Sequence, residues 1–299
     1  MAFVTRFAPS PTGPLHLGHA YSAIVAHDMA RAAGGTFLLR IENIDPTRSR
    51  SEWEAQLFDD LTWLGLRWDA TPLRQSDRQP AYHAALDRLW QAGCLYPCTC
   101  TRRDIEAALG APQEGATHHG PDGPIYPGTC RELIDRKGAL TNNGRPTDQH
   151  LRLNVERSLA RLGMTAGRES EQSIGLSYVE TGPTAPGRHS TRTVDYLSGI
   201  GDVVLARKDF GTSYHLSVVV DDAAQGVTHV TRGEDLREAT AIHVLLQALL
   251  DLPTPAYHHH RLIRDESGKR LAKRDDARAL SRYRAEGATP DDIRRMVGL

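Results

Sequence analysis

The first 41 residues predict a strand, a helix and a second strand, and this unit limits the possible folds more than any other part of the sequence. Residues 2–7 alternate loosely between apolar and polar side chains, which is typical of a short strand. A loop rich in proline and glycine follows, and a helical pattern then covers residues 17–33 until two glycines end it. Residues 36–41 form an apolar run typical of a buried strand. A strand–helix–strand order requires a parallel sheet whose faces are covered by helices, so the sequence predicts an α/β fold.

The rest of the chain continues the alternation, with two interruptions. Leucines at helical spacing predict helices around residues 53–64 and 82–89. Residues 94–148, rich in Gly, Pro, Thr and His, predict an inserted module, and residues 163–193 predict a long surface loop or a poorly ordered linker. The other elements are expected as a hairpin of strands at 202–207 and 214–221, strands at 227–232 and 257–263, and a helix at 239–250.

Composition excludes several classes of protein. The 36 Lys and Arg against 37 Asp and Glu give a net charge of −1, which excludes a protein coated in basic charge but allows a local basic patch. Hydrophobic residues at 39% and charged residues at 24% exclude a disordered or fibrous chain. No apolar run reaches the roughly 18 residues of a membrane span, and the N-terminus lacks a secretory pattern, so we expect a cytoplasmic protein without a membrane partner.

The start of the first helix predicts an anion site. His16 and His19 flank Gly18 where a Pro/Gly loop enters the helix. Backbone N–H groups and the positive end of the helix dipole favour a phosphate there, glycine allows close approach, and both imidazoles can donate to phosphate oxygens. A nucleoside triphosphate is the natural ligand. In isolation, however, the two histidines are explained more simply as residues that cap or pack the helix.

The surrounding sequence resembles a known family. Residues 6–19, RFAPSPTGPLHLGH, resemble the HIGH signature of class I aminoacyl-tRNA synthetases, in the form typical of glutamyl-tRNA synthetases. The resemblance continues through residues 34–45, 218–222 and 231–236. It implies a Rossmann-type catalytic core that binds ATP at the carboxyl ends of its strands.

The resemblance also implies how the chain divides. The two halves of the catalytic domain are expected at residues 1–95 and 151–260, the second half with its loop at 156–193. Residues 96–150 would form an inserted zinc and acceptor module. Residues 261–299 would form a lysine-loop segment and a short C-terminal tail.

The same resemblance implies roles for individual residues. His16, His19 and Lys273 are expected to be catalytic and, with Gly18, to bind ATP. Arg6 and Arg232 match arginines that clamp the side-chain carboxylate of glutamate, a task that suits a bidentate guanidinium. The other expected contacts to L-glutamate are Glu42, which would hold the ammonium group, Ala8, Ser10, and Tyr214 at the start of a strand. Each polar residue taken alone would be explained equally well by a surface salt bridge.

The second family signature is expected in a polar loop, where KRLAKR covers residues 269–274. Lys273 would stabilise the charge that develops on pyrophosphate, with Mg²⁺ bound to the phosphates of ATP. The family usually shows Lys-Leu-Ser-Lys-Arg, whereas Arg270 and Ala272 replace the first lysine and the serine. One lost hydroxyl hydrogen bond, about 1 kcal/mol, predicts slower activation rather than none. Without the resemblance, a solvated basic loop is the simpler interpretation.

The four cysteines predict a metal site, because they all lie within residues 94–130, whereas the disulfides of a chain this long would be spread out. Cys98, Cys100 and Cys130 offer three thiolates, and tetrahedral zinc needs a fourth ligand. Cys94 is expected to pack at a helix end.

Two kinds of residue compete for the fourth position. Ligand chemistry favours His118 or His119, because neutral imidazole is a common zinc ligand and a phenol must first lose its proton. The resemblance instead implies Tyr126, four residues before Cys130, as in shorter glutamyl-synthetase-like proteins. We expect one structural zinc per chain, with Tyr126 as the fourth ligand.

The short C-terminal region bears on the acceptor. Only residues 275–299 follow the lysine loop, fewer than the roughly 50 of a small domain, so we expect no anticodon-binding domain. The resemblance to the shorter proteins implies that glutamyl-adenylate forms without tRNA and that glutamate passes to queuosine in the anticodon arm of tRNA(Asp). Residues 261–299 carry 11 Lys and Arg against 7 Asp and Glu, an excess that can track RNA phosphates.

Two alternatives remain open at this point. One is a truncated glutamyl-tRNA synthetase that charges the 3′ end of tRNA. The other is a non-catalytic, zinc-bearing RNA-binding protein built on the same core, for which the departures at Arg270 and Ala272 would argue.

Overall fold

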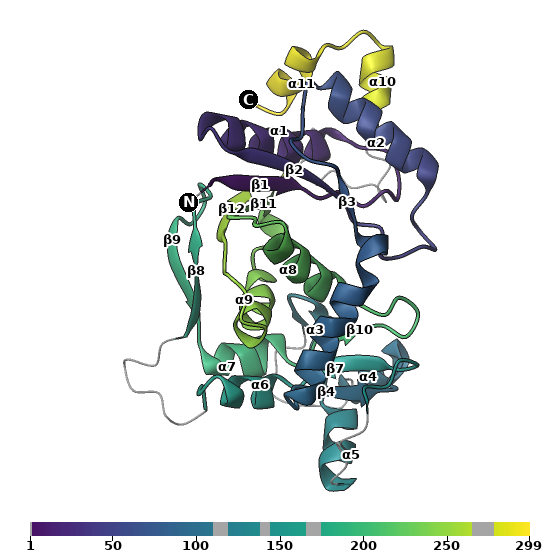
Figure 1. Cartoon of the computed structure of the whole chain (residues 1–299), viewed down its shortest axis with the longest axis vertical. Helices are drawn as coiled ribbons and strands as arrows, with labels where there is room; N and C mark the ends of the chain where they lie inside the picture. The colour runs from purple at the N-terminus through teal and green to yellow at the C-terminus, as the bar shows by residue number, and fades with distance from the viewer. Residues whose placement is uncertain (1, 110–118, 138–143, 166–174, 265–277) are drawn as a thin grey trace.

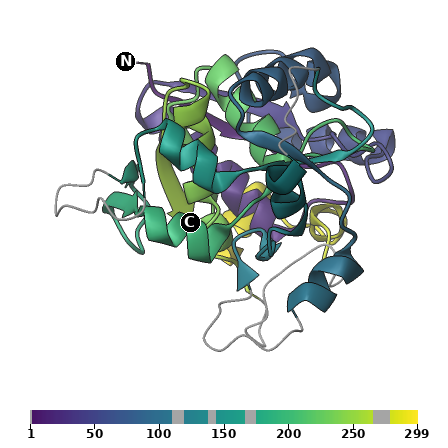
Figure 2. The same cartoon turned by 90° about the horizontal axis from the view of Figure 1, so that it is seen from below.

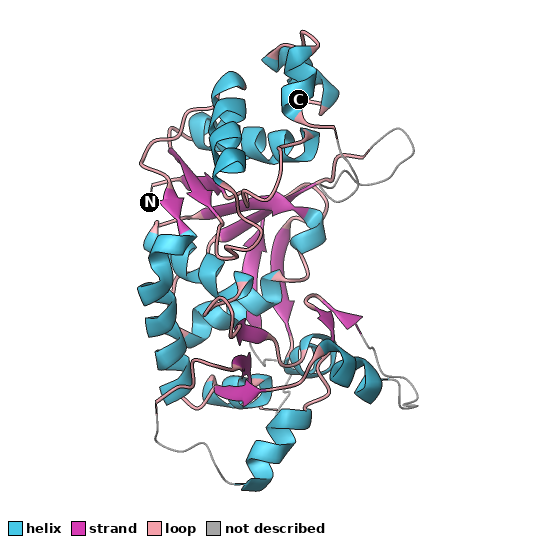
Figure 3. Cartoon of the chain, turned by 90° about the vertical axis from the view of Figure 1, so that its right-hand side faces the viewer, coloured by secondary structure: helices cyan, strands magenta, loops and turns pink. Residues whose placement is uncertain are grey.

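The computed structural model describes residues 2–109, 119–137, 144–165, 175–264 and 278–299. The molecule is elongated, with helices α10 and α11 at one end of its long axis and α5 at the other (Figure 1). Figure 2 looks along this axis from the α5 end. The longest strands gather in the middle of the molecule, between helices, as the colouring of Figure 3 shows. The α/β class expected from the sequence is confirmed.

The predicted strand–helix–strand unit forms a three-stranded sheet. β1 (Val4–Phe7) pairs in parallel with β2 (Thr36–Ile41), and β2 pairs in parallel with the short β3 (Leu73–Arg74). The register places Val4 opposite Thr36.

A separate four-stranded sheet lies beside β1 and comes from the C-terminal part of the chain. β11 (His229–Gly233) lies alongside β1, and the backbone nitrogen of Thr228 donates to Val4 O at 3.0 Å. β11 pairs in parallel with β12 (Ala256–His260), and β12 pairs in parallel with β8 (Leu176–Glu180). β9 (Gly187–Thr191) is antiparallel to β8 at the edge. The parallel order is Rossmann-like and confirms the coarse architecture.

Helices cover both faces of these two neighbouring sheets (Figure 1). α1 (Leu17–Ala32) and α2 (Ser51–Trp63) lie on one side, and α8 (Tyr214–Ala224) and α9 (Thr240–Leu249) on the other. α10 (Leu280–Ala285) and α11 (Pro290–Met296) follow on the α1 side, where Leu280, Ile293 and Val297 join the core of α1 and β2.

A smaller antiparallel sheet lies toward the α5 end. Its order is β10 (Val204–Ala206), β7 (His150–Leu153) and β4 (Leu95–Cys98). The remaining elements are the helices α3 (Gln79–Gln91), α4 (Arg102–Leu109), α5 (Thr129–Lys137), α6 (Val155–Arg161) and α7 (Thr193–Asp195), the strands β5 (His119–Gly120) and β6 (Gly123–Pro124), 3₁₀ turns at Gln75–Arg78 and Glu234–Leu236, and a π turn at Tyr196–Ile200.

One hydrophobic cluster spans the boundaries expected between the domains. It joins residues of α3, β4, β7 and β10 to residues of α8 and α9, including Leu86, Leu95, Leu151, Leu205 and Leu216. The divisions at 95/96 and 150/151 remain predictions from sequence, and the base of the inserted module shares its core with the rest of the chain. Cys94 is buried in this cluster, after the end of α3.

The expected strand at 214–221 is wrong, because Tyr214–Ala224 is the helix α8. The side chain of Ser213 accepts from the backbone nitrogen of Leu216 and caps its first turn. Seven of the eleven residues are buried, Asp221 and Asp222 included, so the apolar run shows no amphipathic period. Such a run cannot be distinguished from a buried strand by periodicity alone.

The expected loop at 163–193 is also wrong in part. Residues 166–174 lie outside the described residues, but β8 and β9 form a regular hairpin, with Leu176 opposite Thr191. The edge strand β9 carries mostly exposed polar residues, and this polarity resembles that of a loop. Among the described residues, no helix is long and apolar enough to cross a membrane.

Candidate active site

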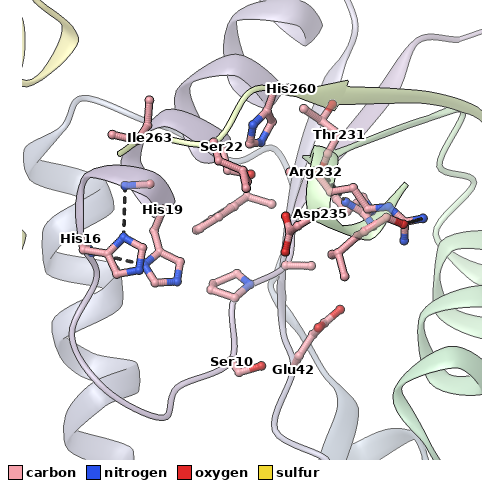
Figure 4. A pocket seen from close by; sticks show the side chains of 18 of the residues that line it. Ser10, His16, His19, Ser22, Glu42, Thr231, Arg232, Asp235, His260 and Ile263 are labelled. Atoms are coloured by element: carbon pink, nitrogen blue, oxygen red, sulfur yellow. Dashed lines mark hydrogen bonds between the residues drawn. The ribbon is translucent and has the colours of Figure 1, made fainter. Parts of the chain in front are cut away.

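A cavity of about 460 Å³ opens where β1, β11 and β12 end and α1 begins (Figure 4). Loops at the carboxyl ends of parallel strands meet there, which is where folds of this kind bind ligands. Nine of the ten non-metal residues predicted for the site line this cavity: Arg6, Ala8, Ser10, His16, Gly18, His19, Glu42, Tyr214 and Arg232. The tenth, Lys273, lies outside the described residues.

His16 and His19 cap the first turn of α1 through their Nδ1 atoms. Nδ1 of His16 accepts from the backbone nitrogen of Gly18 at 3.1 Å, and Nδ1 of His19 accepts from the backbone nitrogen of His16 at 3.2 Å. A neutral imidazole that accepts at Nδ1 carries its proton on Nε2, and an Nε2–H group can donate to a phosphate oxygen. Helix capping and phosphate binding are therefore compatible roles.

Gly18 lies close to the ring of His16. A Cβ atom at residue 18 would lie 3.0 Å from Cε1 and 3.1 Å from Nδ1 of His16. A larger residue would require the capping ring to shift by a few tenths of an ångström. The glycine thus keeps the helix start open and its cap intact.

Arg6 is fixed by a buried ion pair with Asp222. Nε of Arg6 donates to Oδ1 of Asp222 at 2.9 Å, Nη2 donates to Oδ2 at 3.4 Å, and Nη1 donates to Thr231 O at 3.1 Å. Both side chains are less than a tenth exposed. A guanidinium has five N–H hydrogens, so the contacts among described residues leave one on each terminal nitrogen. That is the number of donors that a bidentate carboxylate needs.

Glu42 supplies a carboxylate at the same wall. Its Oε1 accepts from Nη2 of Arg40 at 3.2 Å, and Nη1 of the fully buried Arg40 donates to Asp222 at 2.6 Å. Burial raises the pKa of Glu42, while Arg40 and Arg6 act in the opposite direction. An ammonium group beside Glu42 would favour its ionised form.

Arg232 is more fully bound to the protein than Arg6. It makes four hydrogen bonds, to His259, His243, Thr240 and the carbonyl oxygen of Leu236. Among the contacts of the described residues, this leaves one N–H hydrogen, on Nη1. Arg232 therefore offers the cavity a single donor rather than the pair expected from the sequence.

Tyr214 reaches the cavity from the start of α8 rather than from a strand. Burial raises the pKa of Tyr214, so its hydroxyl stays protonated and is able to donate. Other lining residues were not singled out in the sequence: Ser22, Thr231, Asp235, Leu236, His260, Arg261, Leu262 and Ile263. In the sequence, residues 231–236 belong to a stretch that resembles the family, whereas residues 260–263 were predicted only as the end of a strand.

A second group of side chains lies in the inserted segment. The Sγ atoms of Cys98, Cys100 and Cys130 all lie within 4.8 Å of one another, and Cys100 and Cys130 are 3.5 Å apart. The hydroxyl of Tyr126 lies 3.6 Å from Sγ of Cys98 and 3.3 Å from Sγ of Cys100. Ligands of a tetrahedral zinc with Zn–S bonds of about 2.3 Å are separated by roughly 3.5 to 4 Å. The spacing fits a metal ion of this kind.

The surroundings act differently on the three thiols. Burial raises the pKa of Cys100 to about 11, whereas Cys98 and Cys130 receive hydrogen bonds from neighbouring groups. Nε of Arg152 donates to Sγ of Cys98 at 3.3 Å, and its guanidinium lies 3.9 Å above the ring of Tyr126. Burial acts to raise the pKa of Cys130, but hydrogen bonds from Tyr126 and Thr99 lower it to about 7. His119 is exposed on β5 and is not part of the group, and His118 lies outside the described residues.

Comparison with known proteins gives one family for the whole chain. Residues 2–299 match the model of the family described as tRNA synthetases class I (E and Q), catalytic domain. The chain is 62% identical over 296 residues to a protein of Rhodobacter capsulatus named Glutamyl-Q tRNA(Asp) synthetase, covering 99% of this chain and all of that protein. It is 42% identical to a protein of the same name from Nocardia farcinica, covering 96% of this chain and 81% of that one.

Solved structures support the same fold. The chain resembles a glutamate tRNA ligase from Elizabethkingia meningosepticum, determined in complex with its amino acid, with a TM-score of 0.72 and 25% identity. All of this chain is covered but only 61% of that ligase, so the chain spans less than two thirds of its length. A protein from Campylobacter jejuni described as an arginyl-tRNA synthetase shares the fold, with a TM-score of 0.53 and 12% identity.

Proposed function

The chain belongs to the catalytic-domain family of class I tRNA synthetases for glutamate and glutamine, and we propose that it activates L-glutamate with ATP and transfers it to queuosine in the anticodon arm of tRNA(Asp). The observation that carries the activation step is the convergence of nine predicted residues on one cavity. The acceptor is supported by the name of the Rhodobacter capsulatus relative, which this chain matches over its full length.

Glutamate would be recognised by charge. Arg6 offers two donors to the side-chain carboxylate and is prevented from turning away by Asp222. Arg232 adds one donor from the opposite segment, β11. Glu42 would hold the ammonium group, with Ala8, Ser10 and Tyr214 completing the wall. Glutamine would be disfavoured because its amide nitrogen would face the N–H donors of Arg6.

ATP would bind at the start of α1. The helix N-terminus and the Nε2–H groups of His16 and His19 would face its phosphates, and Gly18 would allow close approach. An α-carboxylate oxygen of glutamate attacks the α-phosphorus, the bond to the bridging oxygen breaks, and pyrophosphate leaves. Lys273 would stabilise the charge on that leaving group. Mg²⁺ would accompany ATP on its phosphates.

The second step needs no tRNA 3′ end. A hydroxyl of the cyclopentene diol of queuosine attacks the activated glutamyl carbonyl carbon, its proton is lost, and AMP leaves with the electrons of the broken bond. The anticodon arm itself would have to enter the cavity.

The cysteine cluster would hold one zinc ion with a structural role. Cys98, Cys100 and Cys130 would supply thiolates and Tyr126 the fourth ligand, because its hydroxyl is the oxygen found beside the sulfurs. Four protein ligands leave no position for a reacting water. The ion would tie β4 to the start of α5 at the base of the inserted module.

Isotope exchange tests the activation step. Exchange of labelled pyrophosphate into ATP should require glutamate and Mg²⁺ and should proceed without tRNA, because all the described groups lie around one cavity. Exchange that appears only after tRNA is added would contradict this proposal. Glutamine and aspartate serve as matched amino acid controls and should support little exchange.

A further inference from the structure

Arg232 lies at the centre of a buried chain of hydrogen bonds that the activation chemistry does not use. One branch runs through His259 to Glu180 on β8. The other runs through His243 on α9 and His215 on α8 to Asp122, in the turn between β5 and β6. Arg232, His215, His243, His259 and Glu180 are all less than a tenth exposed, and Asp122 is partly exposed.

In the first branch, the donors of Arg232 determine which ring nitrogen of His259 carries the proton. A guanidinium only donates, and Nε of Arg232 lies 3.1 Å from Nε2 of His259, so Nε2 of His259 must accept. The imidazole proton therefore resides on Nδ1, which forms a short hydrogen bond with Oε2 of Glu180. The carboxylate is held in turn, because its Oε1 accepts from the backbone nitrogens of Gly182 and His259 at 2.6 and 3.0 Å.

In the second branch, the donors of Arg232 determine the tautomer of His243, which in turn determines the tautomer of His215. Nη1 of Arg232 lies 3.0 Å from Nδ1 of His243, which must accept and thus carries its proton on Nε2. That atom lies 3.1 Å from Nδ1 of His215, so His215 in turn carries its proton on Nε2. The last proton points to Oδ1 of Asp122 at 3.2 Å. Both branches thus begin at a donor and end at a carboxylate.

The surroundings keep the two rings next to Arg232 neutral. Burial and the charge of Arg232 lower the pKa of His259 to about 4 and the pKa of His243 well below its usual value. A protonated ring would present a second N–H group to the guanidinium and would have no acceptor to offer. Neutral histidines in one defined tautomer are therefore what this arrangement requires.

We propose that His243 and His259 are positioning residues that hold the guanidinium of Arg232 at the wall of the glutamate pocket, with Glu180 and Asp122 fixing their tautomers. The two rings accept from Nε and Nη1, while Thr240 and Leu236 accept from Nη2. The single remaining N–H of Arg232 is thereby aimed rather than free to rotate. This inference rests on the proposed function only in taking glutamate as the ligand.

Residues that do not line the glutamate pocket also act on it through Arg232. Asp122 belongs to the inserted segment, and His215 and His243 belong to the two helices on one face of the sheet. Side chains far apart in sequence thus determine the position of one guanidinium.

Paired substitutions test the role in solution. His243→Leu and His259→Leu remove the acceptors and should each raise the glutamate KM of pyrophosphate exchange roughly tenfold or more, with little change in the ATP KM, because a buried charged donor is left unsatisfied. His243→Asn and His259→Gln place an oxygen near the lost Nδ1 or Nε2 and should recover most of the effect. His258→Gln is the matched control on the same strand, since Nδ1 of His258 lies 3.2 Å from Oγ1 of Thr181 rather than beside Arg232, and should behave as wild type.

Equal rises in both KM values, or Asn and Gln variants as impaired as the Leu variants, would show a merely structural role and overturn the proposal.

A measurement on the unaltered protein covers the case in which the Leu variants do not fold. ¹⁵N-histidine NMR at pH 7.5, with the signals assigned to residues, should show His259 neutral, protonated on Nδ1 and hydrogen-bonded, and should show His243 and His215 neutral and protonated on Nε2. His259 protonated on Nε2, or either His243 or His259 charged, would overturn the inference. Absence of glutamate-dependent exchange in the wild type would instead reject the proposed function and leave the tautomers as a separate result.

Discussion

The backbone nitrogen of Cys130 lies 2.8 Å from the hydroxyl oxygen of Tyr126. This bond holds the phenol oxygen beside the sulfurs of Cys98 and Cys100. Burial raises the pKa of Tyr126, and the Cys130 N–H acts in the opposite direction by stabilising the phenolate. A metal ion at the cluster would add a second stabilising charge.

Removal of the Tyr126 hydroxyl should therefore weaken metal binding. We expect about one zinc per chain in the wild type and in His119→Ala, and a lower zinc affinity in Tyr126→Phe, measured by metal analysis after dialysis against a graded chelator. Zinc retained as tightly in Tyr126→Phe as in the wild type, with loss in a His118→Ala, His119→Ala double variant, would assign the fourth position to histidine.

Asp222 should be essential for stability because it neutralises two buried arginines. Its carboxylate binds Arg6 and Arg40, and Asp222→Ala would leave both guanidinium groups buried without this partner. We expect a loss of roughly 3 to 5 kcal/mol in the free energy of unfolding, measured by denaturant titration. Asp59→Ala, which removes an exposed partner of Arg284, should cost less than about 1 kcal/mol. Similar costs for the two variants would contradict this account of the buried network.

Asp60 should make stability depend on pH. It is 1% exposed, neither of its carboxylate oxygens has a hydrogen-bond partner among the described residues, and burial beside Asp59 raises its pKa to about 6. The unfolded chain titrates near 3.9, so the folded state holds more protons between these values, and stability falls as pH rises from about 4 to about 6.

The substitution Asp60→Asn should remove that loss. Relative to the wild type, the variant should gain up to about 2 to 3 kcal/mol in free energy of unfolding between pH 4 and pH 7.5. Comparison across pH cancels any cost of the amide that does not vary with pH. Parallel pH profiles for the two proteins would show that Asp60 is not the group responsible.

Lys273 should act on the rate of adenylate formation. Its contact with the leaving pyrophosphate strengthens as charge develops, so Lys273→Ala should lower kcat of pyrophosphate exchange far more than it raises the glutamate KM. Arg232→Ala should do the reverse, and Lys208→Ala, which removes an exposed lysine elsewhere, should do neither. Equal effects of the Lys273 and Arg232 substitutions on both parameters would overturn the division of roles.

The local sequence was sufficient for elements whose ends carry strong signals. Gly34 and Gly35 end α1 where expected, and the predicted strand at 36–41 matches β2, because the pattern of apolar residues and helix breakers is local. The run 214–221 was assigned to a strand because a helix buried on nearly all sides loses its period. The edge hairpin of β8 and β9 was missed because the exposed polar residues of β9 resemble those of a loop.

The candidate site was predictable where a motif supplied it and not where tertiary packing did. All the described non-metal residues expected from the family resemblance line one cavity. The histidines around Arg232 carry no local signal, since Glu180, His215, His243 and His259 are separated in sequence by up to 79 residues. The structure also reduces the basic excess of residues 261–299. Two of its arginines form ion pairs with acidic residues elsewhere in the chain, Arg284 with Asp59 at 2.7 Å and Arg294 with Asp28 at 2.6 Å.

The acceptor is the central claim, and the site of glutamate attachment tests it most directly. Labelled glutamate, ATP and the protein should be incubated with purified tRNA(Asp) from cells that make queuosine, with tRNA(Asp) that lacks queuosine, and with tRNA(Glu). When the 3′-terminal adenosine has been removed from each tRNA by a nuclease, which leaves the cyclopentene diol of queuosine intact, only queuosine-bearing tRNA(Asp) should still accept glutamate. Charging of tRNA(Glu) at its 3′ end, abolished by removal of the terminal adenosine, with none on queuosine-bearing tRNA(Asp), would contradict the account.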